Sequence, residues 1–138
     1  MIQFTVPGFV QAQERPRFSR MGKGVRTHDA PKSRSYKELV KLVAWENKPQ
    51  KPLDGALRLT IDVYIVPPKN LQTGPKMAEI KQGEIHHTKK PDVENLAKGI
   101  MDGMTGIIYT DDSRVVQLIV TKHYDMQPRA EVRIEVIA

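Results

Sequence analysis

The sequence predicts an α+β fold, a mixed sheet of about four strands with two helices packed on one face. Two observations carry this prediction. Residues 56–66 and 130–136 alternate apolar and polar side chains, which is the period of a strand with one buried and one wet face. Residues 33–46 and 92–104 instead repeat apolar residues at three- and four-residue spacing, which is the period of an amphipathic helix. Strands and helices in this mixture indicate helices layered on one side of a sheet.

The first third of the chain predicts one strand, one long loop and one helix. Residues 2–6 alternate and end at Pro7-Gly8, which is typical of a short strand. Residues 9–32 show no period and contain prolines, glycines and much positive charge, so we expect a long basic loop. Ser33 or Ser35 is expected to cap a helix that runs to about Glu46 and ends before a proline-rich segment.

The rest of the chain completes the set of elements. Residues 56–66 form the clearest strand, and a short helix is expected around residues 75–82. The helix over 92–104 comes next, followed by strands over 115–124 and 130–136 with a turn between them. No internal repeat or low-complexity tract interrupts this order, so we expect residues 1–138 to form a single domain.

Composition narrows the function. The chain has 138 residues and a formal net charge of +6, which favours a polyanionic partner such as nucleic acid. It has no cysteine, which excludes disulfides and thiolate metal sites. No apolar run approaches the roughly 18 residues of a membrane span, and the first residues do not resemble a signal peptide, so a cytoplasmic location without membrane contact is expected.

Positive charge is concentrated in residues 1–37, which carry eight basic residues against Glu14 and Asp29. The basic residues are Arg15, Arg17, Arg20, Lys23, Arg26, Lys32, Arg34 and Lys37. This local excess of six equals the net charge of the whole chain. The N-terminal loop is therefore the expected contact with phosphates, although each of these residues alone could be an ordinary solvated charge.

Acidic residues gather on the helix over 92–104. At about 100° per residue, one side of this helix carries the apolar residues, which we expect to face the core. The apolar residues are Val93, Leu96, Ala97, Ile100, Met101 and Met104. The other side carries Asp92, Glu94, Asn95, Lys98 and Asp102. Asp92 after Pro91 could simply be the N-cap, and Lys98 could pair with Glu94 or Asp102, four residues away on either side.

A second acidic group, Asp111-Asp112, follows a short hydrophobic link. If the link folds back along the helix, these carboxylates approach the Asp92 end. Clustered carboxylates repel one another and need a cation or protons, and oxygen ligands suit Mg²⁺, with Mn²⁺ as a substitute. The alternative is that Asp111 and Asp112 only cap a turn.

The pattern D-V-E-N-L-x-K-x-x-x-D, then D-D-x-R-V-V, resembles the signature of the RusA family of Holliday junction resolvases, as does "ERPRFSR" near the N-terminus. The resemblance implies a homodimer that cuts four-way DNA junctions in recombination and repair, in a bacterium or its prophage. It implies that Asp92, Glu94 and Asp112, with Asp111 beside them, bind a divalent metal. It further implies that Lys98 acts in catalysis. The motif positions expected to orient the site are Asn95 and Asp102. Glu94 departs from the family's usual aspartate, which can alter metal geometry.

The expected chemistry is metal-assisted hydrolysis of a phosphodiester, with the cation polarising the phosphate and activating water. Lys98 would neutralise charge on the phosphate or protonate the leaving group. The residues expected to hold neighbouring phosphates are Arg15, Arg17, Arg20, Lys23, Arg26, Lys89 and Lys90. His86 and His87 lack a third nitrogen ligand nearby, so we expect them to face DNA or solvent rather than to bind metal or act as a base.

Three alternatives remain open from the residues. A restriction-enzyme type of nuclease would need a [DE]-x-K motif downstream of Pro91-Asp92, and Glu94 and Lys98 are four apart. A non-catalytic basic nucleic-acid-binding module would use the acids only as caps and surface pairs. A small structural or interaction protein would need no metal at all. Metal-dependent cutting of a four-way junction that is lost in Asp92→Asn would separate the resolvase interpretation from these alternatives.

Overall fold

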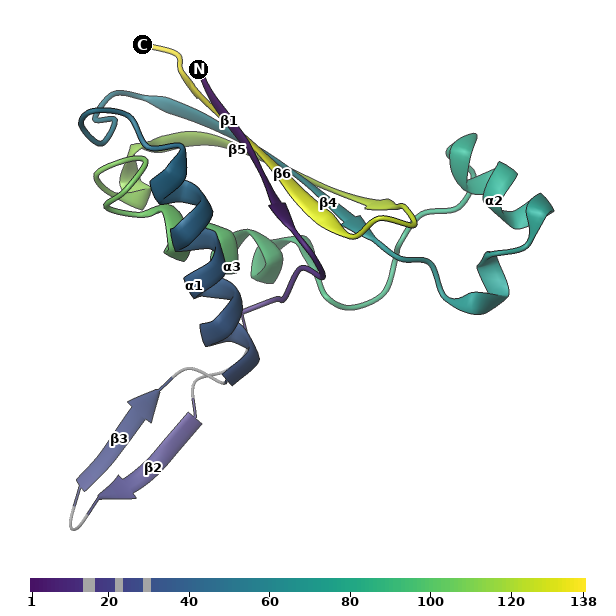
Figure 1. Ribbon diagram of the computed structural model, residues 1–138, viewed down its shortest axis with the longest axis horizontal. Helices are drawn as coiled ribbons and strands as arrows, with labels where there is room; N and C mark the ends of the chain where they lie inside the picture. Colours follow the sequence, from purple (N-terminus) through teal and green to yellow (C-terminus); the bar gives the residue numbers. More distant parts are fainter. Residues whose placement is uncertain (14–16, 22–23, 29–30) are drawn as a thin grey trace.

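The computed structural model describes residues 1–13, 17–21, 24–28 and 31–138, with side chains described for 1–13 and 31–138 (Figure 1). The strands are β1 (Ile2–Pro7), β2 (Arg17–Met21), β3 (Gly24–His28), β4 (Leu57–Ile65), β5 (Val115–Tyr124) and β6 (Arg129–Val136). The helices are α1 (Pro31–Glu46), α2 (Gly74–Lys81) and α3 (Val93–Met104), with short 3₁₀ turns η1 (Lys69–Leu71) and η2 (Asp112–Arg114).

The main sheet is mixed, in the order β1-β6-β4-β5, which confirms the predicted four-stranded mixed sheet. β6 pairs antiparallel with both β1 and β4, whereas β4 and β5 are parallel. Parallel neighbours require a crossover connection rather than a tight turn. Here the crossover contains α2 and α3, so the acidic helix lies directly before the edge strand β5.

Two helices, α1 and α3, pack together on one face of the sheet, as predicted (Figure 1). The core lies between these layers. Its strand side consists of the alternating residues of β4, all fully buried: Leu57, Leu59, Ile61 and Val63. Leu96, Ile100 and Met104 of α3 are equally buried on the helix side. β4 and β6 are the two strands with a partner on each side, so the apolar face of β4 lies in the middle of the core.

The segment over residues 66–90, which we call the α2 arm, extends beyond the end of β4 (Figure 1). It contains η1 and α2, and α2 begins after Thr73, whose hydroxyl accepts a hydrogen bond from the Lys76 amide. α2 has no buried residue. None of the helices in the described part of the chain has the length and apolar character of a membrane span.

Three sequence predictions are corrected. The loop expected over residues 9–32 contains an antiparallel hairpin of β2 and β3, in which Arg17 pairs with His28. β2 pairs only with its sequence neighbour β3, and the many basic residues in both strands hide the apolar–polar alternation that identifies longer strands.

The first helix starts at Pro31 rather than at a serine cap, since proline's fixed φ suits a first helical position. Ser33 is instead buried, and its hydroxyl donates to the Ala12 carbonyl.

The third correction concerns Val93, which was expected to face the core and is 41% exposed. It is the first residue of α3 and lines an open pocket between α3 and β5, so its side chain is only partly covered. The last turns of α3 pack much more closely. A Cβ on Gly103 would lie 2.6 Å from Val40 Cγ1 of α1, so glycine allows the two helices to approach this closely.

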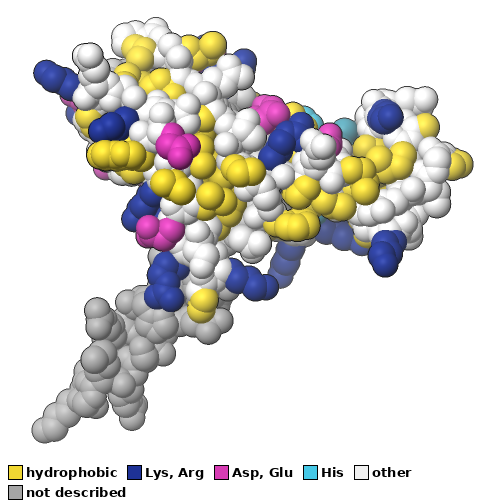
Figure 2. All heavy atoms as spheres, in the orientation of Figure 1, with side chains coloured by type: hydrophobic (Ala, Val, Ile, Leu, Met, Phe, Trp, Pro, Cys, Tyr) yellow, Lys and Arg dark blue, Asp and Glu magenta, His cyan; other side chains and the backbone are white. Residues whose placement is uncertain are grey.

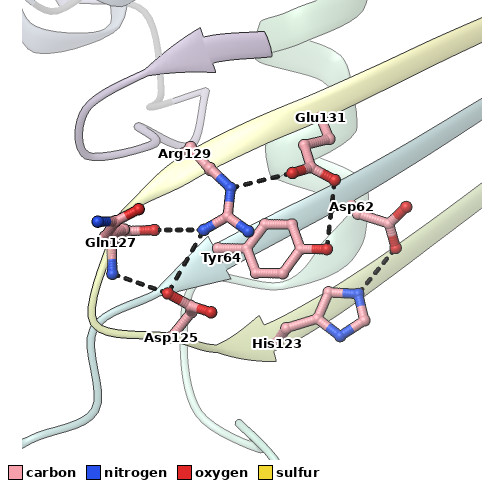
Figure 3. A network of polar contacts seen from close by, with 7 residues as sticks. All are labelled: Asp62, Tyr64, His123, Asp125, Gln127, Arg129 and Glu131. Carbon is pink, nitrogen blue, oxygen red and sulfur yellow. Dashed lines mark hydrogen bonds and ion pairs between the residues drawn. The ribbon is translucent and has the colours of Figure 1, made fainter.

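On the face of the sheet away from the helices, polar side chains at alternate positions of the strands are joined by hydrogen bonds and ion pairs (Figure 3). The ring of Tyr64 is stacked on His123 and lies beneath the Arg129 guanidinium, 3.7 Å from the ring centre. His123 Nε2 is 2.7 Å from Asp62 Oδ1, and Arg129 Nε donates to Glu131 at 3.0 Å. These cross-strand pairs stabilise the wet face without a second layer of helices.

Candidate active site

Asp92 is the N-cap of α3. Its Oδ1 accepts a hydrogen bond from the Asn95 amide at 3.0 Å, and its backbone is extended, as an N-cap requires. Pro91 before it ends the preceding loop, so the local sequence determines where α3 begins. The cap interpretation of Asp92 is therefore confirmed, and it occupies one carboxylate oxygen. Glu94 lies in the first turn and is exposed.

Asp112 is held by two hydroxyl groups. Thr105 Oγ1 donates to Asp112 Oδ1 at 2.6 Å, and the Tyr109 hydroxyl donates to the same oxygen at 3.1 Å. Tyr109 is fully buried, and burial, with the nearby Asp112 carboxylate, raises its pKa above the ordinary value. The phenol therefore stays protonated and remains a donor. Both bonds use Oδ1, so neither occupies Oδ2.

Asp111 has a different role from its neighbour. Its Oδ2 accepts a hydrogen bond from the Ser113 amide at 2.9 Å, which caps η2. Hydrogen bonds from Ser113 lower the pKa of the Asp111 carboxyl, so it stays ionised. The same turn is tied to another loop through Asp54, whose Oδ1 is 2.9 Å from both Arg114 Nε and Thr110 Oγ1. These contacts fix the position of the acidic pair relative to the core.

One pocket of about 510 Å³ joins the two acidic stretches. Glu94, Asp102 and Asp112 line it, together with Lys98. Its apolar wall comes from α3 and from the helix-facing side of β5, and consists of Val93, Ala97, Met101, Leu118 and Val120. The hydrophobic link therefore brings Asp112 back to α3, but Asp112 bonds to Thr105 at the C-terminal end of the helix rather than approaching the Asp92 end as expected. Asp92 and Asp111 are not among the residues that line this pocket.

Lys98 lies between acids of the same helix face. Its Nζ is 4.0 Å from Asp102 Oδ2, and Lys37 Nζ of α1 is at the same distance from that oxygen. Pairs of this length at a surface contribute little to stability. Their effect is positional, because Asp102 keeps an ammonium group beside the pocket that Glu94 and Asp112 share.

The donor set fits a hard divalent cation in chemistry. The pocket offers carboxylate oxygens and no thiolate or imidazole, and such oxygens are the ligand type of Mg²⁺ or Mn²⁺. The described residues do not contain three metal-ligating side chains already close enough to hold an ion. On the face turned to the viewer in Figure 2, acidic side chains likewise stand singly among hydrophobic ones. Three carboxylates therefore line one pocket without being close enough together to form a finished metal site among the described residues.

The predicted DNA contacts divide into two groups. Lys89 and Lys90 are exposed on the loop before α3. This loop is held by Lys122 of β5, whose ammonium donates to the carbonyls of Lys89 and Pro91 at 3.0 and 3.1 Å. Arg17 and Arg20 lie on β2 and Arg26 on β3. Arg15 and Lys23 lie outside the described residues.

Sequence reasoning missed the residues that position the acids. Thr105, Tyr109 and Lys122 carry no motif, and their contacts join segments whose approach only the fold determines. The spacing of Tyr109 from Asp112 offered one signal, since an aromatic hydroxyl three residues before an acid can reach it across a turn. The backbone amide of Gln13 donates to the backbone carbonyl of Asn95 at 3.1 Å, and this bond joins the segment before β2 to α3.

Comparison with known proteins agrees with this geometry. The family model described as endodeoxyribonuclease RusA matches residues 7–135, which includes the hairpin, the acidic helix and the Asp111-Asp112 turn. The chain is also similar to an uncharacterized protein, YqaN, of Bacillus subtilis (strain 168). The two are 39% identical over 138 residues, covering 99% of this chain and 97% of YqaN. The chain belongs to the RusA endodeoxyribonuclease family.

Proposed function

We propose that this chain is a metal-dependent endodeoxyribonuclease that resolves four-way (Holliday) DNA junctions by paired phosphodiester hydrolysis, in DNA recombination and repair. One observation carries the proposal. In a chain of the RusA endodeoxyribonuclease family, Glu94 and Asp112 come from separate stretches and line one pocket with Lys98. We include in the proposal that residues 1–138 form one nuclease domain, located in the cytoplasm and encoded by a bacterium or prophage.

Glu94 and Asp112 would hold a divalent cation, Mg²⁺ or Mn²⁺, with Asp92 and Asp111 supplying further oxygens. When bound, the ion supplies Lewis-acid activation of the scissile phosphate and of the attacking water. The chain's own contribution begins with Asp112, whose Oδ1 is held by Thr105 and Tyr109 so that Oδ2 can serve as a ligand. Glu94 is one methylene longer than aspartate and exposed, so it can adjust its reach.

Lys98 would act on the phosphate rather than on the cation. Its ammonium lies on the same pocket as both acids and one helical turn after Glu94. There it can neutralise negative charge that develops in the transition state, or donate a proton to the departing oxygen. Asp102, 4.0 Å from Lys98 Nζ, limits the directions in which the ammonium can turn. Asn95 is the remaining polar residue of this face and is expected to help orient the site.

Resolution of a junction requires two cuts, which is why we propose a homodimer. The edge strand β5 supports this, because its outer side is unpaired in the sheet and it carries exposed apolar residues. Val116 is 62% exposed and Leu118, beside the active-site pocket, is 44% exposed. A second copy that covers this edge would place its own pocket nearby. Sedimentation should show twice the 15.7 kDa chain mass, and Val116→Glu should return the protein to a monomer.

The function is tested with a labelled synthetic four-way junction, with and without Mg²⁺. We expect paired nicks that need the metal and that disappear in Asp92→Asn, with a linear duplex of the same sequence cut far less. Junction binding without cleavage under Mg²⁺ and Mn²⁺ would replace the nuclease with a non-catalytic basic nucleic-acid-binding module. If the protein shows no salt-sensitive binding to the junction, it is neither a junction nuclease nor a nucleic-acid-binding module.

A further inference from the structure

A second pocket lies where the α2 arm meets the end of β5. Its volume is about 260 Å³, and its lining includes Lys81, His86, His87, Lys122 and His123. None of the described residues that line it is acidic, in contrast to the active-site pocket with its three carboxylates. Figure 2 shows histidine side chains where the body of the sheet meets the arm. A concave site of cationic and imidazole groups without an acid is suited to an anion.

Some of the side chains in this second pocket have polar atoms that are not used by other described residues. The Lys122 ammonium has three protons, and two are used by the Lys89 and Pro91 carbonyls. The Nδ1 atom of His87 is buried and has no hydrogen-bond partner among the described residues. Burial, and then the charges of Lys122 and Lys89, lower the pKa of His87, so this imidazole would meet an anion as a neutral hydrogen-bond donor and the positive charge would come from the lysines. His123 differs, since its Nε2 is already bonded to Asp62 (Figure 3).

The two pockets follow each other along β5. The active-site pocket contacts Leu118 and Val120, and the second contacts Lys122 and Tyr124. Successive same-face residues of a strand are about 6.6 Å apart, whereas phosphates on one DNA strand recur about every 3.4 Å along the helix axis. The midpoints of these two residue pairs are four residues, or about 13 Å, apart along β5, which matches about four such DNA steps. A DNA strand whose scissile phosphate enters the active site can therefore place a phosphate about four nucleotides away in the second pocket.

We infer that the pocket bounded by Lys81, His86, His87 and Lys122 binds a backbone phosphate of the DNA strand that is cleaved, about four nucleotides from the scissile one. The inference rests on the proposed function for the identity of its ligand. It assigns the α2 arm, which has no buried helix residue, a role in holding substrate. Lys122 then has two roles, because the same ammonium that faces the phosphate holds the loop leading to Asp92.

The test uses the full chain with no divalent metal, so that binding is measured without cleavage. Lys81 is the exposed last residue of α2, and Lys51, exposed on the loop between α1 and β4, is the matched control. Binding of a four-way junction weakens as salt is added, and the plot of log binding constant against log salt has a negative slope. If Lys81 faces a phosphate, Lys81→Ala should make this slope less negative by about 0.9. Lys51→Ala should leave the slope unchanged. Equal slopes for all three proteins would contradict the inference.

Histidine NMR signals separate this inference from the proposed function. Inorganic phosphate, and then the junction, should both shift the ring signals of His86 and His87. A junction that is bound, and cut when Mg²⁺ is added, while these signals stay in place would overturn the phosphate subsite and leave the nuclease intact. Signals that move with phosphate but not with bound junction would also reject it as a DNA subsite. A junction that is not bound at all would overturn both proposals.

Discussion

Tyr109→Phe tests whether the buried phenol holds Asp112. The substitution removes one hydroxyl group and keeps the aromatic ring, which is fully buried in the core. It deletes the donor to Asp112 Oδ1 at 3.1 Å and a long contact to the Met101 carbonyl at 3.4 Å. Thr105 Oγ1 would remain as the other donor to Asp112. The perturbation is therefore local to the acid.

The expected loss follows from the kind of bond. A hydrogen bond to a charged group contributes about 1.5–3 kcal/mol to stability. Asp112 is exposed and keeps its Thr105 bond, so we expect the lower part of this range, about 1.5–2 kcal/mol. Urea denaturation measures this as a lower midpoint with an unchanged slope. If the bond also positions Asp112 for catalysis, junction cleavage falls by up to about tenfold, since 1.4 kcal/mol is one factor of ten.

Tyr36→Phe is the matched control. Tyr36 is also buried, but its hydroxyl has no hydrogen-bond partner among the described residues. Removing an unpaired buried hydroxyl relieves a desolvation cost, so the free energy of unfolding should stay the same or rise by up to about 1 kcal/mol. The reasoning is refuted if Tyr36→Phe destabilises the protein as much as Tyr109→Phe, or if Tyr109→Phe changes nothing.

Alkaline titration gives the same pair a second readout. Burial raises the pKa of both Tyr36 and Tyr109 above the ordinary value near 10. The unfolded chain therefore loses these phenol protons first as pH rises, so stability is full below about pH 10 and falls above it. Each Phe variant should lose less stability between pH 9 and 11 than the parent chain. Parallel curves for all three proteins would show that neither phenol is held protonated by the fold.

Three further predictions follow from other elements. Asp112→Asn should abolish junction cleavage while leaving binding intact or tighter, because less negative charge faces the phosphates; loss of binding as well would indicate a structural role. Arg17→Ala on β2 should weaken binding and flatten its salt dependence, and an unchanged salt slope in a filter-binding series would remove β2 from the interface. Gly103→Ala should lower the free energy of unfolding by about 1–3 kcal/mol despite the better helix propensity of alanine, because its Cβ would meet Val40 Cγ1 at 2.6 Å. Adding Val40→Ala should recover part of the free energy lost to overpacking. If the double variant loses as much free energy of unfolding as the two single variants added together, the contact with Val40 is not the cause.

Sequence periodicity predicted most of the fold, since the strands and helices of the main sheet each have a regular apolar face. β4 alternates without a break and α3 repeats at helical spacing, so the burial of Leu59 and Ile100 could be expected. The β2–β3 hairpin could not, because its five-residue strands carry no apolar alternation. Strand order and the parallel pairing of β4 with β5 are also invisible to local pattern, because they depend on how the crossover packs.

The candidate site could be predicted only in part. The motif indicated Asp92, Glu94, Lys98, Asp111 and Asp112, of which Glu94, Lys98 and Asp112 line one pocket and Asp92 and Asp111 do not. The division between Asp111, which caps η2, and Asp112, which faces the pocket, depends on the backbone of a single turn. The second pocket could not be expected either, because Lys81 and Lys122 are 41 positions apart and meet only where the α2 arm returns to β5.

The most direct test of the account is the position of Mn²⁺ in a crystal soaked with the ion, located by its anomalous scattering. The account predicts a peak in the α3–β5 pocket, bound by carboxylate oxygens of both Glu94 and Asp112 at about 2.0–2.3 Å. The peak should disappear in Asp112→Asn crystals of the same form. A fully occupied Mn²⁺ elsewhere on the chain, with both of these carboxylates unbound, would contradict it.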